Sequence, residues 1–116
     1  MTKERMEKLM GMFQGIGVET EGGKHYFYEV SGMGMAFEDA VKRVNDKFSG
    51  MEWGKYKVFI AQSEEVERMV NFHGEEVVIY ETKDGDVVAV LENQAIRVFE
   101  SVDRAIDKLY KAGFIF

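Results

Sequence analysis

Hydrophobic and polar positions are patterned most clearly in the last third of the chain, where they predict a three-strand meander. Val77 to Tyr80 is apolar and leads to Asp84-Gly85, a dipeptide that accepts the positive φ angles of a type I′ hairpin turn. Val87 to Leu91 is apolar without alternation, which is typical of a strand covered on both faces. After a predicted turn at 92–94, Ala95 to Phe99 alternates and forms the third strand. The middle strand is therefore expected to have a neighbour on each side.

A helix after the meander is marked at its start, along its face and at its end. Ser101 can accept a hydrogen bond from a free backbone N–H of the first turn, and Asp103 places negative charge at the positive end of the helix dipole. Gly113 can adopt the left-handed conformation that ends a helix, with Phe114 packed on the last turn. The apolar residues of the expected helix recur at helical spacing: Val102, Ala105, Ile106, Leu109 and Tyr110.

The first half of the chain predicts a helix, a hairpin and a second helix. Thr2 can cap a helix that ends near Gly15 or Gly17, and Gly22-Gly23 separates two strands at 18–21 and 24–31. Both predicted helices carry an apolar stripe at helical spacing. The stripes are Met6, Leu9, Met10 and Phe13 in the first helix, and Phe37, Ala40, Val41, Val44 and Phe48 in the second.

The middle of the chain predicts a strand and a short helix. Tyr56 to Ala61 has the composition of a strand. Ser63 to His73 is expected to be helical, because Ser63 can cap it, two glutamates open it and Gly74 can stop it. The apolar residues Val66, Met69 and Val70 would form its buried stripe.

These elements predict one α+β domain over residues 1–116, in the order α-β-β-α-β-α-β-β-β-α. The sheet should be mainly antiparallel, with about six strands and three to four packed helices. Tyr56 to Ala61 has the option of parallel pairing, since helices enter and leave it. The order is similar in outline to roadblock or longin-like scaffold domains, apart from the strand and helix at 56–73. That resemblance favours partner binding over chemistry.

Composition narrows the function classes. The 116 residues include no cysteine, which excludes disulfides, thiolate metal sites and cysteine nucleophiles. The balance of 21 acidic and 15 basic residues gives a net charge of −6, which works against binding to nucleic acid or anionic lipid. The two histidines, His25 and His73, have no metal-site spacing, so no metal or cofactor is expected. No stretch is long enough to span a membrane or reads as a signal peptide, and we expect a cytoplasmic protein.

Glu81-Thr82-Lys83, at the end of an apolar strand, resembles the E-x-K element of restriction-endonuclease-like nucleases. The resemblance implies that Glu81, with a carboxylate on an adjacent strand, would hold a divalent metal, and that Lys83 would help to activate the attacking water. The upstream acidic residues that could supply the second carboxylate are Glu64, Glu65 and Glu67, all within the predicted helix. The other interpretation is that Glu81 and Lys83 lie on a solvent face beside a polar turn.

Two further segments have a functional and a structural interpretation. Gly32-Met33-Gly34 follows a strand and opens a helix, so Gly32 and Gly34 could let a phosphate approach the helix N-terminus, although a strand-to-helix turn explains the same glycines. Tyr26, Phe27 and Tyr28, beside Lys24, form an aromatic ribbon of the kind on which bases stack. Glu21 and Glu29 flank this ribbon and weaken a positive field, so burial is the favoured interpretation.

Surplus apolar residues provide the last indication of function. Several of the eight methionines lie near predicted loops or helix ends, and the chain finishes with Phe114-Ile115-Phe116. These three residues either dock on their own domain or form an interface with another chain. We expect a protein-interaction or regulatory module without catalysis, homodimeric or bound to another protein. The alternatives are the metal-dependent nuclease with Glu81 and Lys83, and ligand binding at the Gly32–Gly34 turn.

Overall fold

The computed structural model describes residues 1–30, 34–49, 55–91 and 95–116. These segments contain three helices and eight strands, and the strands form two antiparallel sheets, which confirms the α+β class. The helices are α1 (Lys3–Met12), α2 (Phe37–Phe48) and α3 (Val102–Lys111). The strands are β1 (Gly15–Thr20), β2 (His25–Glu29), β3 (Tyr56–Ala61), β4 (Ser63–Asn71), β5 (Glu76–Thr82), β6 (Val87–Leu91), β7 (Ala95–Phe99) and β8 (Phe114–Ile115).

The strands divide between a three-stranded sheet of order β2-β1-β3 and a five-stranded sheet of order β7-β6-β5-β4-β8. The strand at Tyr56–Ala61 pairs with β1 in antiparallel register, so the parallel option considered for it is wrong. The predicted meander is confirmed, because β6 pairs with β5 on one side and with β7 on the other. Its turn at 92–94 lies outside the described residues.

The predicted helix at Ser63–His73 is wrong, because this segment is strand β4 followed by a turn. β4 pairs along most of its length with β5, and its pairing register shifts between Glu65 and Glu67. Such a bulge inserts one extra residue and breaks the period of two that marks a strand. The apolar side chains of β4 therefore recur at a spacing that imitates a helix.

Three hairpins have the same type of turn, in which a Thr or Asn is followed three residues later by a glycine with positive φ. The φ angles are 81° at Gly23, 81° at Gly74 and 91° at Gly85. No positive φ occurs at the preceding residue of any of these turns, so the type I′ prediction for Asp84-Gly85 is wrong. The pattern is that of a three-residue loop closed by a left-handed glycine. The side-chain oxygen of the first residue accepts a backbone N–H beyond the turn in each case: Thr20 from Lys24, Asn71 from Glu75, and Thr82 from Asp86.

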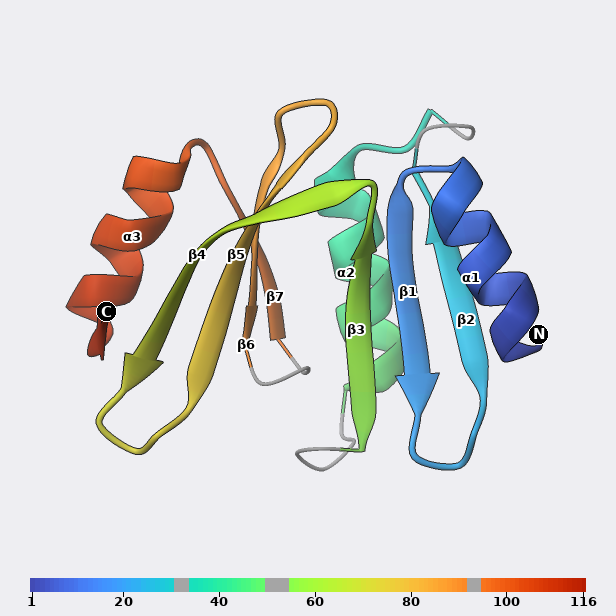
Figure 1. The fold of residues 1–116 in the computed structure, drawn as a ribbon, viewed down its shortest axis with the longest axis horizontal. Helices are drawn as coiled ribbons and strands as arrows, with labels where there is room; N and C mark the ends of the chain where they lie inside the picture. Colours follow the sequence, from blue (N-terminus) through green and yellow to red (C-terminus); the bar gives the residue numbers. More distant parts are fainter. Residues whose placement is uncertain (31–33, 50–54, 92–94) are drawn as a thin grey trace.

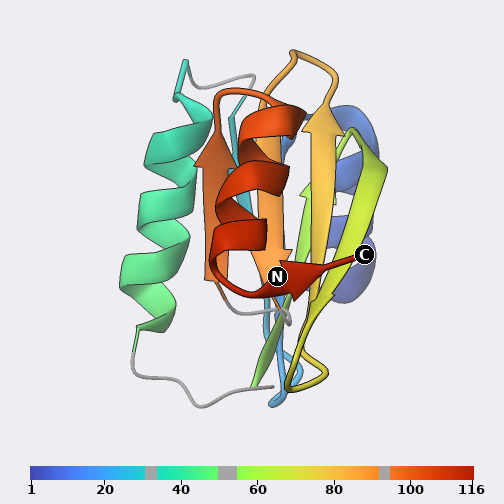
Figure 2. The same cartoon turned by 90° about the vertical axis from the view of Figure 1, so that its left-hand side faces the viewer.

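The helices and sheets pack in layers (Figures 1 and 2). α1 covers the outer face of the three-stranded sheet, α2 lies between the two sheets, and α3 covers the outer face of the five-stranded sheet. Among the described residues this packing gives two hydrophobic clusters, and β6 contributes to both: Val88 and Val90 to one, Val87 and Ala89 to the other. The prediction that β6 is covered on both faces is therefore confirmed, as is the buried stripe of α2.

The chain passes from one sheet to the other at Gln62, between β3 and β4. Gln62 has a φ of 57°, a left-handed conformation that is uncommon for a residue with a side chain. Hydrogen bonds hold this corner from three directions. The Gln62 side chain donates to the Gly11 carbonyl at 2.8 Å, the Lys83 N–H donates to the Gln62 carbonyl at 3.0 Å, and the Ser63 hydroxyl donates to the Ile60 carbonyl at 2.8 Å. The corner therefore ties α1, β4 and the β5–β6 turn together.

Candidate functional site

The E-x-K residues line a cleft beside the Gln62 corner. The cleft has a volume of about 410 Å³. Its lining residues come from the start of β4 and the end of β5: Gln62, Ser63, Glu64, Glu81, Thr82 and Lys83. Thr82 is buried and holds the turn, whereas Glu64, Glu81 and Lys83 are exposed. The two candidate residues of the alternative function therefore share one concave surface.

Glu64 lies directly opposite Glu81 in the register of β4 and β5. Opposite residues of an antiparallel pair point to the same face, with Cβ atoms about 4.5–5.5 Å apart, and like charges there are unfavourable. β4 therefore places a second carboxylate beside Glu81, which a helix at 63–73 would not have done. A cation between the two carboxylates would relieve their repulsion. Within the described residues, however, no group of three or more histidine, aspartate or glutamate side chains is placed to hold a metal ion.

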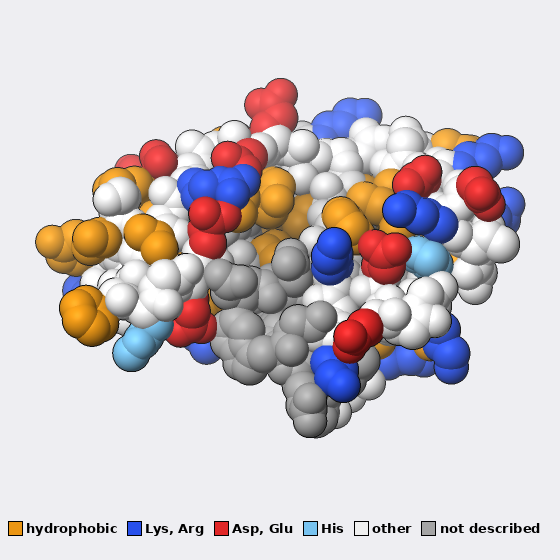
Figure 3. Space-filling view, turned by 60° about the horizontal axis from the view of Figure 1, so that its bottom comes forward, with side chains coloured by type: hydrophobic (Ala, Val, Ile, Leu, Met, Phe, Trp, Pro, Cys, Tyr) orange, Lys and Arg blue, Asp and Glu red, His pale blue; other side chains and the backbone are white. Residues whose placement is uncertain are grey.

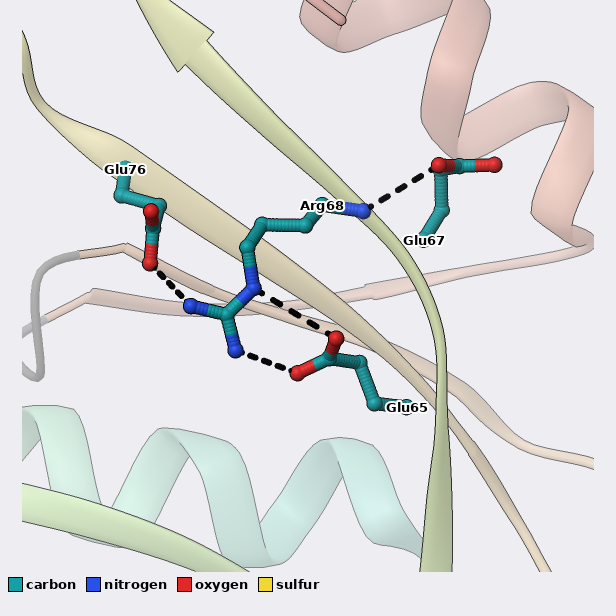
Figure 4. A network of polar contacts seen from close by, with 4 residues as sticks. All are labelled: Glu65, Glu67, Arg68 and Glu76. Carbon is teal, nitrogen blue, oxygen red and sulfur yellow. Dashed lines mark hydrogen bonds and ion pairs between the residues drawn. The ribbon is translucent and has the colours of Figure 1, made fainter.

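The neighbouring glutamate, Glu65, is committed to a different contact on the other face of the strand (Figure 4). Arg68 donates two hydrogen bonds to its carboxylate and a further one to Glu76. The hydrogen bond from Arg68 lowers the pKa of Glu65 below its ordinary value, with burial opposing it and the charge of Arg68 adding to it. This ion-pair cluster keeps Glu65 ionised. Glu67 lies opposite Ile79 and accepts the backbone N–H of Arg68, so Glu64 is the upstream carboxylate that lies beside Glu81.

The glycine turn before α2 is described only in part. Gly32 lies outside the described residues, and Gly34 has a φ of 65°, a left-handed conformation that glycine adopts freely. α2 begins at Phe37, and its N-cap Ala36 makes no side-chain cap hydrogen bond. The turn interpretation accounts for Gly34, and no contact in the described segments favours a ligand there.

The three C-terminal residues divide between the core and the surface. Phe114 is 6% exposed and belongs to the cluster under α3, whereas Ile115 and Phe116 are 54% and 66% exposed. β8 pairs Phe114 with Asn71 and Ile115 with Val70, at the edge of the five-stranded sheet. Phe72, in the adjoining β4–β5 turn, is 96% exposed. We call Phe72, Ile115 and Phe116 the C-terminal patch.

Figure 3 shows hydrophobic side chains gathered at the end of the molecule that carries α3 and β8. Ile115 and Phe116 were predicted from the sequence to form an interface together with Phe114, whereas Phe72 was not, because its segment was predicted to be a helix. A signal was present, since Asn71 to Gly74 has the same spacing of polar residue and glycine as the other two hairpin turns. His73, the last residue of the predicted helix, instead lies in this turn, where its backbone N–H donates to the Asn71 side chain.

Comparison with known proteins adds no further assignment. No protein-family model matches the chain, and neither a curated protein nor a solved structure does. Among the described residues, no helix is long and apolar enough to cross a membrane.

Proposed function

We propose that this chain is a protein-interaction module without catalysis of its own, and that it self-associates through the C-terminal patch. The observation that supports this proposal is the exposure of Phe72, Ile115 and Phe116 at one edge of the five-stranded sheet. Large apolar side chains that gather at one place, rather than scatter singly, are typical of interaction sites.

The rest of the same sheet edge is built in a way that discourages strand addition. β4 beyond β8 carries Glu64, Glu65, Glu67 and Arg68, and its bulge falls between Glu65 and Glu67. Charged side chains and bulges are the means by which proteins protect an open edge. The part of the edge at Ile115 and Phe116 lacks charged side chains, so the contact should form there.

A second copy of the chain is the partner that we propose. The three side chains of the patch carry no charge, so a two-fold rotation that brings the patch against itself places no like-charged patch side chains in contact. With an aromatic side chain burying about 200 Å², three side chains exposed to these degrees offer roughly 400 Å² per copy. A standard stable interface buries about 800 Å² per partner. The dimer should therefore be weak and should dissociate on dilution.

Light scattering over a hundredfold range of concentration tests the proposal. Phe114 is part of the core, so truncation at this residue would confuse assembly with folding. The informative variants are Ile115→Lys and Phe116→Lys, and the control is Met12→Lys, an apolar residue of α1 that is 58% exposed at the opposite end of the molecule. We expect both patch variants to stay monomeric and the control to dimerise like the intact chain. An intact protein that is monomeric at every concentration would refute self-association.

A metal-dependent nuclease is the second candidate, and the placement of Glu64 opposite Glu81 favours it. In this arrangement the two carboxylates would hold Mg²⁺ or Mn²⁺, and Lys83 would orient or activate the attacking water. The test is to incubate DNA and RNA with the protein in each metal. Cleavage that is lost in Glu64→Gln, Glu81→Gln and Lys83→Ala, but kept in the control Glu100→Gln, would establish this activity and replace the binding module as the function.

A further inference from the structure

A second concave surface lies at the other end of the three-stranded sheet, where three separate segments meet. The β1–β2 turn, the last turn of α2 and the start of β3 surround a cleft of about 660 Å³. Its lining residues are Thr20, Glu21, Gly22, Lys24, Tyr26, Lys47, Phe48 and Lys55. The cleft is shallow and open to solvent, and its volume falls within the range of about 300–1,000 Å³ that is usual for small-molecule sites. We call it the lysine cleft.

The charge of the lysine cleft is opposite to that of the whole chain. Three lysines line it against one glutamate, whereas the chain has a net charge of −6. The glutamate, Glu21, lies 3.9 Å from the Lys55 ammonium, so its charge is offset within the cleft. Because of this ion pair, Glu21 weakens the positive field at the hairpin less than an unpaired glutamate would. Lys24 and Lys47 remain to act on a ligand.

The floor of the cleft is formed by the rings of Tyr26 and Phe48, which belong to a packed group of three aromatic rings. The ring of Tyr26 meets Phe48 edge to face, with centroids 5.5 Å apart, and Phe48 stacks on Tyr56 at 5.2 Å. The Lys47 ammonium lies 4.9 Å from the centroid of the Tyr26 ring, within the range of a cation–π contact. Lys47 is thus held over the aromatic floor.

Hydrogen bonds donated by backbone N–H groups hold the chain at the other two lysines. The Glu21 N–H donates to the Lys55 carbonyl at 2.8 Å, which ties the hairpin to the start of β3. The Lys24 N–H donates to the Thr20 hydroxyl at 3.1 Å, which fixes the turn. The backbones that carry the three ammonium groups are therefore arranged before any ligand arrives, which lowers the entropic cost of binding.

We propose that the lysine cleft binds a small phosphorylated molecule, with its phosphate facing Lys24 and Lys47 and its organic part against Tyr26. Phosphate is the anion that fits, since it accepts hydrogen bonds from several ammonium donors at once. The ligand is small, because a long polyanion would extend past the cleft onto an acidic protein and be repelled. This site is independent of the C-terminal patch and adds a ligand to the proposed binding module.

Titration calorimetry of the full chain at constant ionic strength tests the proposal. The probes are inorganic pyrophosphate, ADP and, as an uncharged control, adenosine. We expect ADP to bind, pyrophosphate to bind more weakly, and adenosine not to bind. Lys24→Gln and Lys47→Gln should each weaken ADP binding by about tenfold. Lys111→Gln, on α3 at the other end of the molecule, should leave it unchanged.

Each other result counts against the site. No heat with either phosphate probe would refute it, and equal loss in Lys111→Gln would reduce it to nonspecific charge attraction. Adenosine binding as tightly as ADP would show that the lysines play no part. A twelve-nucleotide RNA that binds more tightly than ADP, with the same dependence on Lys24 and Lys47, would replace the small ligand with a nucleic acid strand. Lys24 and Lys47 are both exposed, so their variants are expected to fold, and circular dichroism checks this.

Discussion

α3 packs on the five-stranded sheet through a buried face to which Leu109 belongs. Leu109 is 4% exposed and lies in the cluster that includes Val77, Ile79, Ala105 and Phe114. Leu109→Ala removes most of a buried side chain, and the lost transfer free energy alone is about 2.4 kcal/mol at 0.8 kcal/mol per methylene. The cavity left behind adds to this, so the free energy of unfolding should fall by about 2–5 kcal/mol.

The matched control is Tyr110→Ala, one residue along the same helix, where the side chain is 64% exposed. Its effect should stay within about 0.5 kcal/mol, because a surface substitution in a helix removes little burial and alanine is a good helix former. Urea denaturation followed by circular dichroism measures both. Equal effects of the two substitutions, or an unchanged midpoint for Leu109→Ala, would refute the assignment of the buried face of α3.

Two further predictions concern the glycines of the first half of the chain and the tyrosines. Gly15→Ala should destabilise the fold strongly, because the added Cβ would lie 2.4 Å from the Tyr28 carbonyl oxygen. Gly11→Ala, with open space around it in α1, should instead stabilise the fold by about 0.5–1 kcal/mol. Thermal melts of the two variants test this, and the opposite order of stability would contradict the packing of β1 against β2. Burial raises the pKa of Tyr28, Tyr56 and Tyr80 above the ordinary value, so the stability that they contribute is complete below about pH 10 and is lost as the pH rises through their folded-state pKa values. Tyrosinate absorbance and denaturation at rising pH measure this loss, and a single titration of all five tyrosines near pH 10 with unchanged stability would contradict it.

Elements defined by local chemistry could be predicted from the sequence. α3 is one example, because Ser101 caps it through a hydrogen bond to the Arg104 N–H and Gly113 ends it with a φ of 100°. The bounds of β3, β6 and β7 were likewise predicted, since their apolar runs are set off by polar or glycine-containing segments. In these segments, composition and nearby turn residues favour the same conformation.

β4 and β8 could not be predicted, because distant pairing decides both. β4 is half exposed and bulged, so its own residues carry no clear alternation, and only its register with β5 makes it a strand. β8 is two residues long and exists through its contacts with Val70 and Asn71. The candidate site depends on the same distant pairing, because Glu64 lies opposite Glu81 only when β4 is a strand paired with β5. The division into two sheets rests on the left-handed Gln62, which no glycine marks in the sequence.

Self-association through the C-terminal patch is tested most directly by amide NMR spectra of the intact chain over a hundredfold dilution. If copies associate through the C-terminal patch, the amide signals of Val70, Asn71 and Ile115 should shift with concentration, while those of β2, in the other sheet, should not. Added salt should increase the shifts, because it screens the repulsion between two chains that each carry a net charge of −6. Spectra that do not change on dilution, or that change at β2 and not at β8, would contradict self-association through this patch.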